Sequence, residues 1–269
     1  MKLKLVRHLW GVTEPLATAL PQFKAFGYEA IEAPFNASEA LPELLREHQL
    51  DFIAMAFPGG VDVDAHLVAL EKNLEQCAAT NPIQVTVHSG SDAWSLDQMI
   101  RYYTKAAAIE KNFPFPVGHE LHRGRALFSP WSTREVLQAS PDTKIVCDFS
   151  HWVCVAERLN WDDEAGSILA LCAERALHIH ARVGYEEGPQ VPDPSAPEYA
   201  HHVDCHLQWW DAMWASQKRR GMKASTVTPE FGPPGYLHTL PHTQAPVADL
   251  DKVVNWLAVK VRERFNNAR

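Results

Sequence analysis

The fold is decided by the stretch in which IQVTVH (83–88) is followed by SLDQMIRYYTKAAAIEKN (95–112). Its first part is a short β-type run, and its second part is a longer helix-like segment. The same order recurs along the whole chain of 269 residues. The other β-type runs are LKLVR (3–7), AIEAP (30–34), DFIAMAF (51–57), PVGHEL (116–121), KIVCDF (144–149), ALHIHA (176–181) and STVTPEF (225–231).

Eight β-then-α units in one chain predict a (β/α)8 TIM barrel, which is an α/β fold. A doubly wound sheet usually has fewer strands and a glycine-rich fingerprint after the first, and this sequence lacks that fingerprint. No linker of Pro, Gly or Ser divides the chain, so we expect a single domain over residues 1–269. The long irregular stretch 183–202 follows the seventh run, and loops of that length are usually functional lids.

Composition narrows the classes of partner. The net charge of −8 disfavours a nucleic-acid backbone, which is bound by clustered Lys and Arg. No apolar run approaches the roughly 20 residues that span a bilayer. The start, MKLKLVRHLWG, has too short an apolar stretch for a signal peptide. We therefore expect no membrane partner and a cytoplasmic location.

Ionisable residues stand at nearly every strand end. In such barrels the active site lies at the C-terminal ends of the strands. The segment HRGR (122–125), directly after the fifth run, is the most basic of these ends. His8 and Glu32, on the first two units, are predicted to be pocket wall or packing. The other strand-end residues of interest are His88, Glu120, Asp148, His151, His178, His180, Arg182 and Glu230.

Glu120, Asp148, His180 and Glu230 come from four successive strands. Three carboxylates and one imidazole that converge would repel one another strongly unless a cation neutralised them. This set therefore predicts one divalent metal ion. Oxygen-rich ligation with one nitrogen favours Mn²⁺, with Mg²⁺, Co²⁺ or Zn²⁺ as alternatives.

Simpler interpretations exist for single members of the set. Glu120 also suits a salt-bridged loop residue, and Asp148 also suits a helix N-cap. His178 and His180 share one strand face, so both point inward, and His180 is preferred as the ligand because it lies nearer the strand end. For His88, a role as a substrate contact and a role as a structural loop residue are about equally favoured.

The motifs GHELH (118–122), CDFSH (147–151), HIH (178–180) and PEFG (229–232) resemble, in this order, the xylose isomerase-like TIM barrels. This group is also called the sugar phosphate isomerase/epimerase superfamily, and the resemblance covers essentially the whole chain. It implies that Glu120, Asp148, His180 and Glu230 bind one divalent metal and that the two glutamates move protons on opposite sides of a substrate. It also implies that His151 and Arg182 contact the substrate.

The loop after the fifth strand departs from the usual family pattern because it is more basic. His122, Arg123 and Arg125 are therefore candidate substrate contacts, together with His88. Arginines of this kind could hold a carboxylate or phosphate with two hydrogen bonds.

The resemblance implies a metal-dependent sugar isomerase or epimerase acting on a keto-sugar or related polyol through an enediolate. One glutamate removes the proton next to the carbonyl, and the other returns it to the opposite face. A metal-dependent keto-sugar or keto-inositol lyase or dehydratase would share the enediolate. The expected partner is a small-molecule carbohydrate, and a homo-oligomer remains open.

Two further classes are less favoured. An abasic-site endonuclease shares the barrel but needs a three-zinc cluster with an Asp-x-His pair after the seventh strand, and no such pair occurs in the sequence. A non-catalytic sugar-binding barrel would be expected to lack a metal ligand, whereas all four are present.

Overall fold

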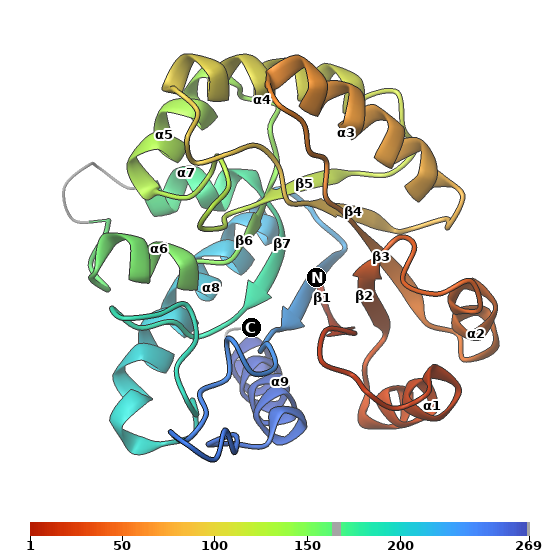
Figure 1. Cartoon of the computed structure of the whole chain (residues 1–269), viewed down its shortest axis with the longest axis vertical. Helices are drawn as coiled ribbons and strands as arrows, with labels where there is room; N and C mark the ends of the chain where they lie inside the picture. The colour runs from red at the N-terminus through yellow and green to blue at the C-terminus, as the bar shows by residue number, and fades with distance from the viewer. Residues whose placement is uncertain (163–167, 268–269) are drawn as a thin grey trace.

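The computed structural model describes residues 1–162 and 168–267, which form a closed parallel barrel surrounded by helices (Figure 1). The strands follow one another around the barrel in chain order, and β1 pairs with β8 to close it. The strands are β1 (Lys2–His8), β2 (Ala30–Pro34), β3 (Asp51–Ala56), β4 (Gln84–Val87), β5 (Val117–Glu120), β6 (Ile145–Cys147), β7 (Ala176–Ala181) and β8 (Ala224–Pro229). The predicted (β/α)8 fold is confirmed.

The described helices lie outside the barrel and bury one face against it (Figure 1). They are α1 (Leu16–Phe26), α2 (Leu41–Glu47), α3 (Val63–Ala78), α4 (Leu96–Glu110), α5 (Pro130–Ala139), α6 (Ser150–Ala156), α7 (Ile168–Arg175), α8 (Ala200–Arg219) and α9 (Leu250–Asn267). Helix α4 shows how local sequence sets a boundary. Ser95 accepts a hydrogen bond from the Gln98 backbone N–H, and the Gln98 side chain accepts one from the Ser95 N–H, which satisfies two free donors of the first turn.

Several predicted runs are longer than the strands they contain. Strand β6 ends at Cys147 and β8 at Pro229, so Asp148 and Glu230 lie just beyond the hydrogen-bonded strands. Because all strands are parallel, their C-terminal ends share one rim. Side chains of residues directly after the strands therefore meet above the barrel interior.

The long loop after β7 is packed against its neighbours. Gln190 is buried, and its side chain donates to the Gly232 carbonyl (3.1 Å) and accepts from the Gly232 N–H (2.7 Å). The Val191 N–H also donates to the Val183 carbonyl (2.9 Å). The irregular stretch ends where α8 begins, at Ala200, and its role as a lid stays a prediction.

Among the helices that the structure describes, none combines the length and apolar character needed to cross a membrane.

Candidate active site

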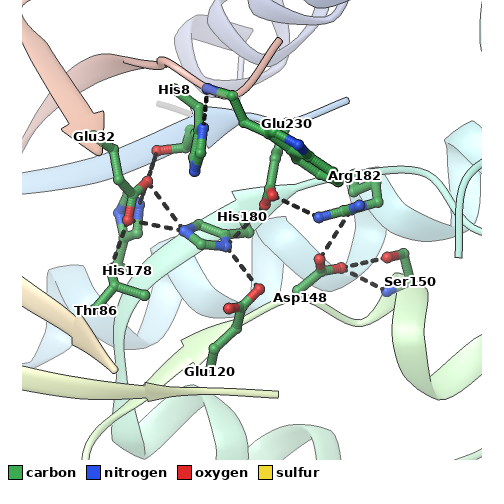
Figure 2. Close-up of polar contacts among 12 residues, drawn as sticks. His8, Glu32, Thr86, Glu120, Asp148, Ser150, His178, His180, Arg182 and Glu230 are labelled. Atoms are coloured by element: carbon green, nitrogen blue, oxygen red, sulfur yellow. Dashed lines mark hydrogen bonds and ion pairs between the residues drawn. The ribbon is translucent and has the colours of Figure 1, made fainter. Parts of the chain in front are cut away.

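The four predicted metal ligands meet at the rim of the barrel. Each offers one ligand atom, and these atoms all lie within 4.8 Å of one another. All four side chains are buried, with Glu230 the most exposed at 4%. Figure 2 shows them arranged around the His180 ring, with Glu120 and Glu230 on the side of its Nδ1 atom. The cluster consists of Glu120, Asp148, His180 and Glu230.

The geometry of this cluster fits a cation. His180 Nδ1 lies 3.0 Å from Glu120 Oε1 and 2.9 Å from Glu230 Oε2. Within the described part of the chain, Glu120 Oε2 and Glu230 Oε2 are buried without a well-oriented hydrogen bond. Each of these oxygens faces only an imidazole nitrogen, His88 Nε2 for Glu120 and His180 Nδ1 for Glu230. Buried carboxylate oxygens that lack a good hydrogen bond are costly. A divalent ion among these oxygens and the nitrogen would satisfy them, and the donor set suits Mn²⁺ or Mg²⁺.

Arg182 partly neutralises two of the carboxylates. Its Nε donates to Asp148 Oδ2 (3.1 Å), and its Nη2 donates to Glu230 Oε1 (2.6 Å). Burial alone would raise the pKa of Glu230, but Arg182 and His180 outweigh it and lower that pKa to about 2. For Asp148, burial prevails over Arg182 and raises the pKa to about 7. The positive charge near Asp148 is therefore too small to offset the burial of its carboxylate.

Asp148 is not the helix N-cap that its simpler interpretation would make it, because Phe149 is the N-cap of α6. The Asp148 Oδ1 atom accepts from the backbone N–H (3.0 Å) and the hydroxyl (2.5 Å) of Ser150, the first residue of α6. Its Oδ2 faces Arg182. One oxygen therefore fixes the carboxylate to the helix, while the other faces the site.

His88 accompanies Glu120. Its Nε2 lies 2.5 Å from Glu120 Oε2, at the wall of the cavity. Burial opposes ionisation of Glu120, yet His88 and His180 hold its pKa well below the usual value. Glu120 is therefore a carboxylate at neutral pH.

Glu32 has a larger role than the expected pocket wall or packing. Both of its oxygens lie 3.1 Å from His180 Nε2. They also accept hydrogen bonds from the Thr86 and Thr228 hydroxyls, each at 2.6 Å. A carboxylate accepts only, so His180 Nε2 donates to Glu32, while Nδ1 faces Glu120 and Glu230 (Figure 2). Burial opposes a charge on the ring, yet Glu32, Glu230 and Glu120 raise the pKa of His180 well above its usual value, so Nδ1 also carries a proton, which a bound metal would displace. The signal available in the sequence was a lone carboxylate inside the apolar run AIEAP (30–34).

Glu32, His178 and His180 form a second group whose atoms are close enough to hold a metal. Here the hydrogen bonds are already made. Each Glu32 oxygen accepts from a threonine hydroxyl, and His178 Nδ1 lies 2.9 Å from the Thr226 carbonyl, to which it donates. This deeper group is a hydrogen-bonded layer that supports the cluster above it.

A cavity of about 750 Å³ opens beside the cluster. Among the predicted substrate contacts, its lining includes His88, His122, Arg125 and Arg182. Arg123 is exposed outside this lining, with its guanidinium over the Tyr236 ring at 5.2 Å. Burial lowers the pKa of His122 to about 4, so its ring is neutral at neutral pH.

His151 is completely buried behind His122, and the two ring centroids are 3.9 Å apart. His151 Nε2 lies 3.5 Å from Asp148 Oδ2, too long for a good hydrogen bond. The substrate-binding roles of His151, Arg182, His88, His122, Arg123 and Arg125 stay predictions.

Two aromatic residues complete the wall of the cavity. Trp10 and Tyr236 meet edge to face, with ring centroids 5.0 Å apart. The Arg182 guanidinium lies over the Tyr236 ring at 4.9 Å. Gly232 leaves the room that the indole needs, because a Cβ there would stand 2.2 Å from a ring carbon of Trp10.

No family model and no curated protein matches this sequence. Solved structures do match in fold over nearly the whole chain. A xylose isomerase-like TIM barrel protein from Mycobacterium smegmatis, in complex with magnesium, aligns with a TM-score of 0.66 at 10% identity, over 99% of this chain and 97% of the other. An L-ribulose 3-epimerase aligns with a TM-score of 0.65 at 12% identity, over 100% and 96%.

A probable 3-DHS dehydratase from Bacillus anthracis aligns with a TM-score of 0.59 at 13% identity, over 96% of this chain and 98% of the other. At such identities the likeness concerns the fold. The chain has the fold of the xylose isomerase-like TIM barrels, so the resemblance carried by its strand-end motifs is confirmed at that level. Structures with this fold include several sugar epimerases.

Proposed function

We propose that the chain is a divalent-metal-dependent isomerase or epimerase that acts on a keto-sugar or related polyol through an enediolate. The observation that carries this proposal is the pair Glu120 and Glu230. These carboxylates come from different strands and converge within 3.0 Å and 2.9 Å of one imidazole nitrogen, beside a cavity that fits a small molecule. Two carboxylates at one reacting centre are suited to removing and returning a proton.

The residues that would hold the ion are Glu120, Asp148, His180 and Glu230, and Mn²⁺ is the favoured occupant. A bound divalent ion would supply positive charge against the negative charge that develops on a substrate carbonyl oxygen.

The proton transfers belong to the chain itself. Glu120 and Glu230 both have lowered pKa values and are ionised at neutral pH, which is the state that accepts a proton. One takes the proton from the carbon next to the carbonyl, and the other, after taking up a proton from solvent, delivers it to the opposite face. Arg182 orients Glu230 through a 2.6 Å hydrogen bond, and His88 lies against Glu120.

Glu32 is a positioning residue in this scheme. Because His180 Nε2 donates to the Glu32 carboxylate, the ring cannot turn or change tautomer without losing that hydrogen bond. Carboxylates that accept from the second nitrogen of a ligand histidine commonly fix its tautomer and orientation.

The test is a panel of ketoses, aldoses and 3-keto-sugars incubated in D₂O with Mn²⁺, Co²⁺ or Mg²⁺ and followed by NMR. We expect a metal-dependent epimer or isomer with deuterium at the carbon next to the carbonyl. Glu120→Gln should abolish turnover and keep the fold. Glu43→Gln, at an exposed position of α2, should retain the turnover of the wild type. Full activity of Glu120→Gln would overturn the assignment.

The same assay separates the lyase or dehydratase alternative. Elimination would begin with the same proton abstraction but would release water or an alcohol, which mass spectrometry detects directly. If the mass of the product is lower than that of the substrate by one leaving group, the protein is a lyase or dehydratase and the isomerase proposal is wrong.

A further inference from the structure

The cavity has two halves of different chemistry. One half of the lining is polar apart from Tyr236 and includes Arg182 and Glu230. Its residues come from the segments at and after β4, β5, β7 and β8. Twelve lining residues come from β1, β2, β3 and the segments that follow them, and nine of these are apolar. The largest are Leu9, Trp10, Val12, Leu16, Met55 and Phe57.

The polar members of this second half do little to change its character. His8 Nδ1 accepts from the Trp10 N–H (2.7 Å), and its Nε2 lies 3.0 Å from Met55 Sδ. Burial lowers the pKa of His8, so the ring is neutral. Glu14 is exposed and accepts a hydrogen bond from Gln22. The apolar half therefore offers few groups that could bind a hydroxyl.

A bare hexose fits this cavity poorly. Its volume of about 750 Å³ lies in the upper part of the roughly 300–1,000 Å³ range of pockets for drug-sized ligands. Sugar hydroxyls placed against the apolar half would leave water without gaining partners, which costs free energy. Phe57 is 45% exposed and its ring centroid lies 4.7 Å from that of His88, so apolar surface begins directly beside the polar half.

We propose that the cavity binds a keto-sugar carrying an aryl substituent away from its hydroxyketone group, with the aryl ring in the apolar half. This inference rests on the proposed function for the sugar end of the ligand. An aromatic ring suits the apolar half because Trp10 and Phe57 line it, and aromatic rings pack well in offset and edge-to-face contacts. A planar ring also loses less conformational freedom on binding than a flexible alkyl chain.

The test compares ligands that differ only in the substituent. Methyl and phenyl 3-keto-β-D-glucoside form one pair, and D-fructose and 6-O-benzyl-D-fructose form the other. Their dissociation constants are measured by calorimetry with the full chain supplied with Mn²⁺, and turnover is followed in parallel. In at least one pair the aryl member should bind about tenfold or more tightly, since burial of apolar surface drives its binding.

Two variants locate the effect. Phe57→Ser changes a half-exposed side chain of the apolar half and should reduce the aryl preference at least about threefold. Val61→Ser lies outside the cavity lining at a side chain that is 96% exposed, so it should keep the preference.

The outcomes separate the two proposals. Equal affinity within both pairs, or an aryl preference that Phe57→Ser leaves unchanged, overturns the aryl subsite, whether or not the sugars are turned over. An aryl preference without turnover of any ligand supports the subsite and contradicts the isomerase function. If no member of either pair binds, the keto-sugar aryl substrate is overturned.

Discussion

Glu32 and His180 face each other so that both carboxylate oxygens lie 3.1 Å from a single ring nitrogen, Nε2. The pair joins two levels of the barrel. Below it, Thr86 and Thr228 donate to the same carboxylate, and above it, His180 Nδ1 turns toward Glu120 and Glu230. The orientation of the predicted ligand is therefore set by residues that do not touch the cavity.

Replacement of Glu32 by Gln should weaken metal binding. A neutral amide attracts the Nε2 proton less strongly, so His180 is held less firmly in the tautomer that frees Nδ1. Loss of such a partner typically costs about 10- to 100-fold in metal affinity. The measurement is calorimetric titration with Mn²⁺, and Glu29→Gln, at an exposed position just before β2, is the matched control. Wild-type affinity in Glu32→Gln would show that the pair does not position the ligand.

Replacement of Thr228 by Val gives a milder version of the same change. It removes the 2.6 Å hydrogen bond to Glu32 Oε2 and keeps the side-chain volume close to the original. We expect a smaller loss of Mn²⁺ affinity than with Glu32→Gln, because Oε2 keeps its contact with His180 Nε2 at 3.1 Å. The expected loss of stability is about 1.5–3 kcal/mol, the typical contribution of a hydrogen bond to a charged group. Titration and urea unfolding of the same samples report both quantities. A larger loss of Mn²⁺ affinity than in Glu32→Gln would show that Thr228 does not act through Glu32.

Gly232→Ala should disturb the cavity wall. The added Cβ would stand 2.2 Å from a ring carbon of Trp10, so the indole must move. Overpacking of this kind typically costs about 1–3 kcal/mol. Urea unfolding monitored by tryptophan fluorescence measures the change, and Gly59→Ala is the control because a Cβ there meets no atom within 4 Å. Equal stability of the two variants would mean that Trp10 is loosely held.

His206 makes stability depend on pH. Its Nδ1 donates to the His202 carbonyl (2.8 Å), and its Nε2 accepts from the Gly184 N–H (3.3 Å), so the buried ring is neutral. Burial lowers the pKa of His206 to about 4, against the effect of the His202 carbonyl. Between pH 6.5 and 4 the unfolded chain binds a proton that the folded chain does not, so the free energy of unfolding falls as the pH falls.

At pH 5 this loss amounts to about 2 kcal/mol relative to pH 7.5. His206→Gln should flatten the pH dependence by that amount in urea unfolding. His201→Gln, at an exposed position of the same helix, should leave it unchanged. Parallel curves for wild type and His206→Gln would contradict the role assigned to His206.

Much of the fold follows from local pattern. The β-type runs and helical segments of the printed sequence match the strands and most of the helices, because alternation of the two elements has few compact solutions. The convergence of Glu120 and Glu230 follows as well, since parallel strands place their ends on one rim. These predictions needed only chain order.

What could not be predicted depends on contacts between distant strands. The role of Glu32 arises from Thr86 and Thr228, which lie 54 and 196 positions away. The apolar half of the cavity is assembled from three separate segments, and nothing in a single segment marks it. Arg123 lies outside the cavity lining, and its guanidinium packs over the ring of Tyr236, a residue from a distant segment of the chain.

The most direct test of the central claim is a crystal structure of the full chain grown with Mn²⁺, in which the anomalous signal locates the ion. We predict one strong peak at bonding distance, about 2.0–2.3 Å, from carboxylate oxygens of Glu120, Asp148 and Glu230 and from His180 Nδ1. A site without a peak at saturating Mn²⁺, or a peak bound instead by Glu32 and His178, would contradict the account.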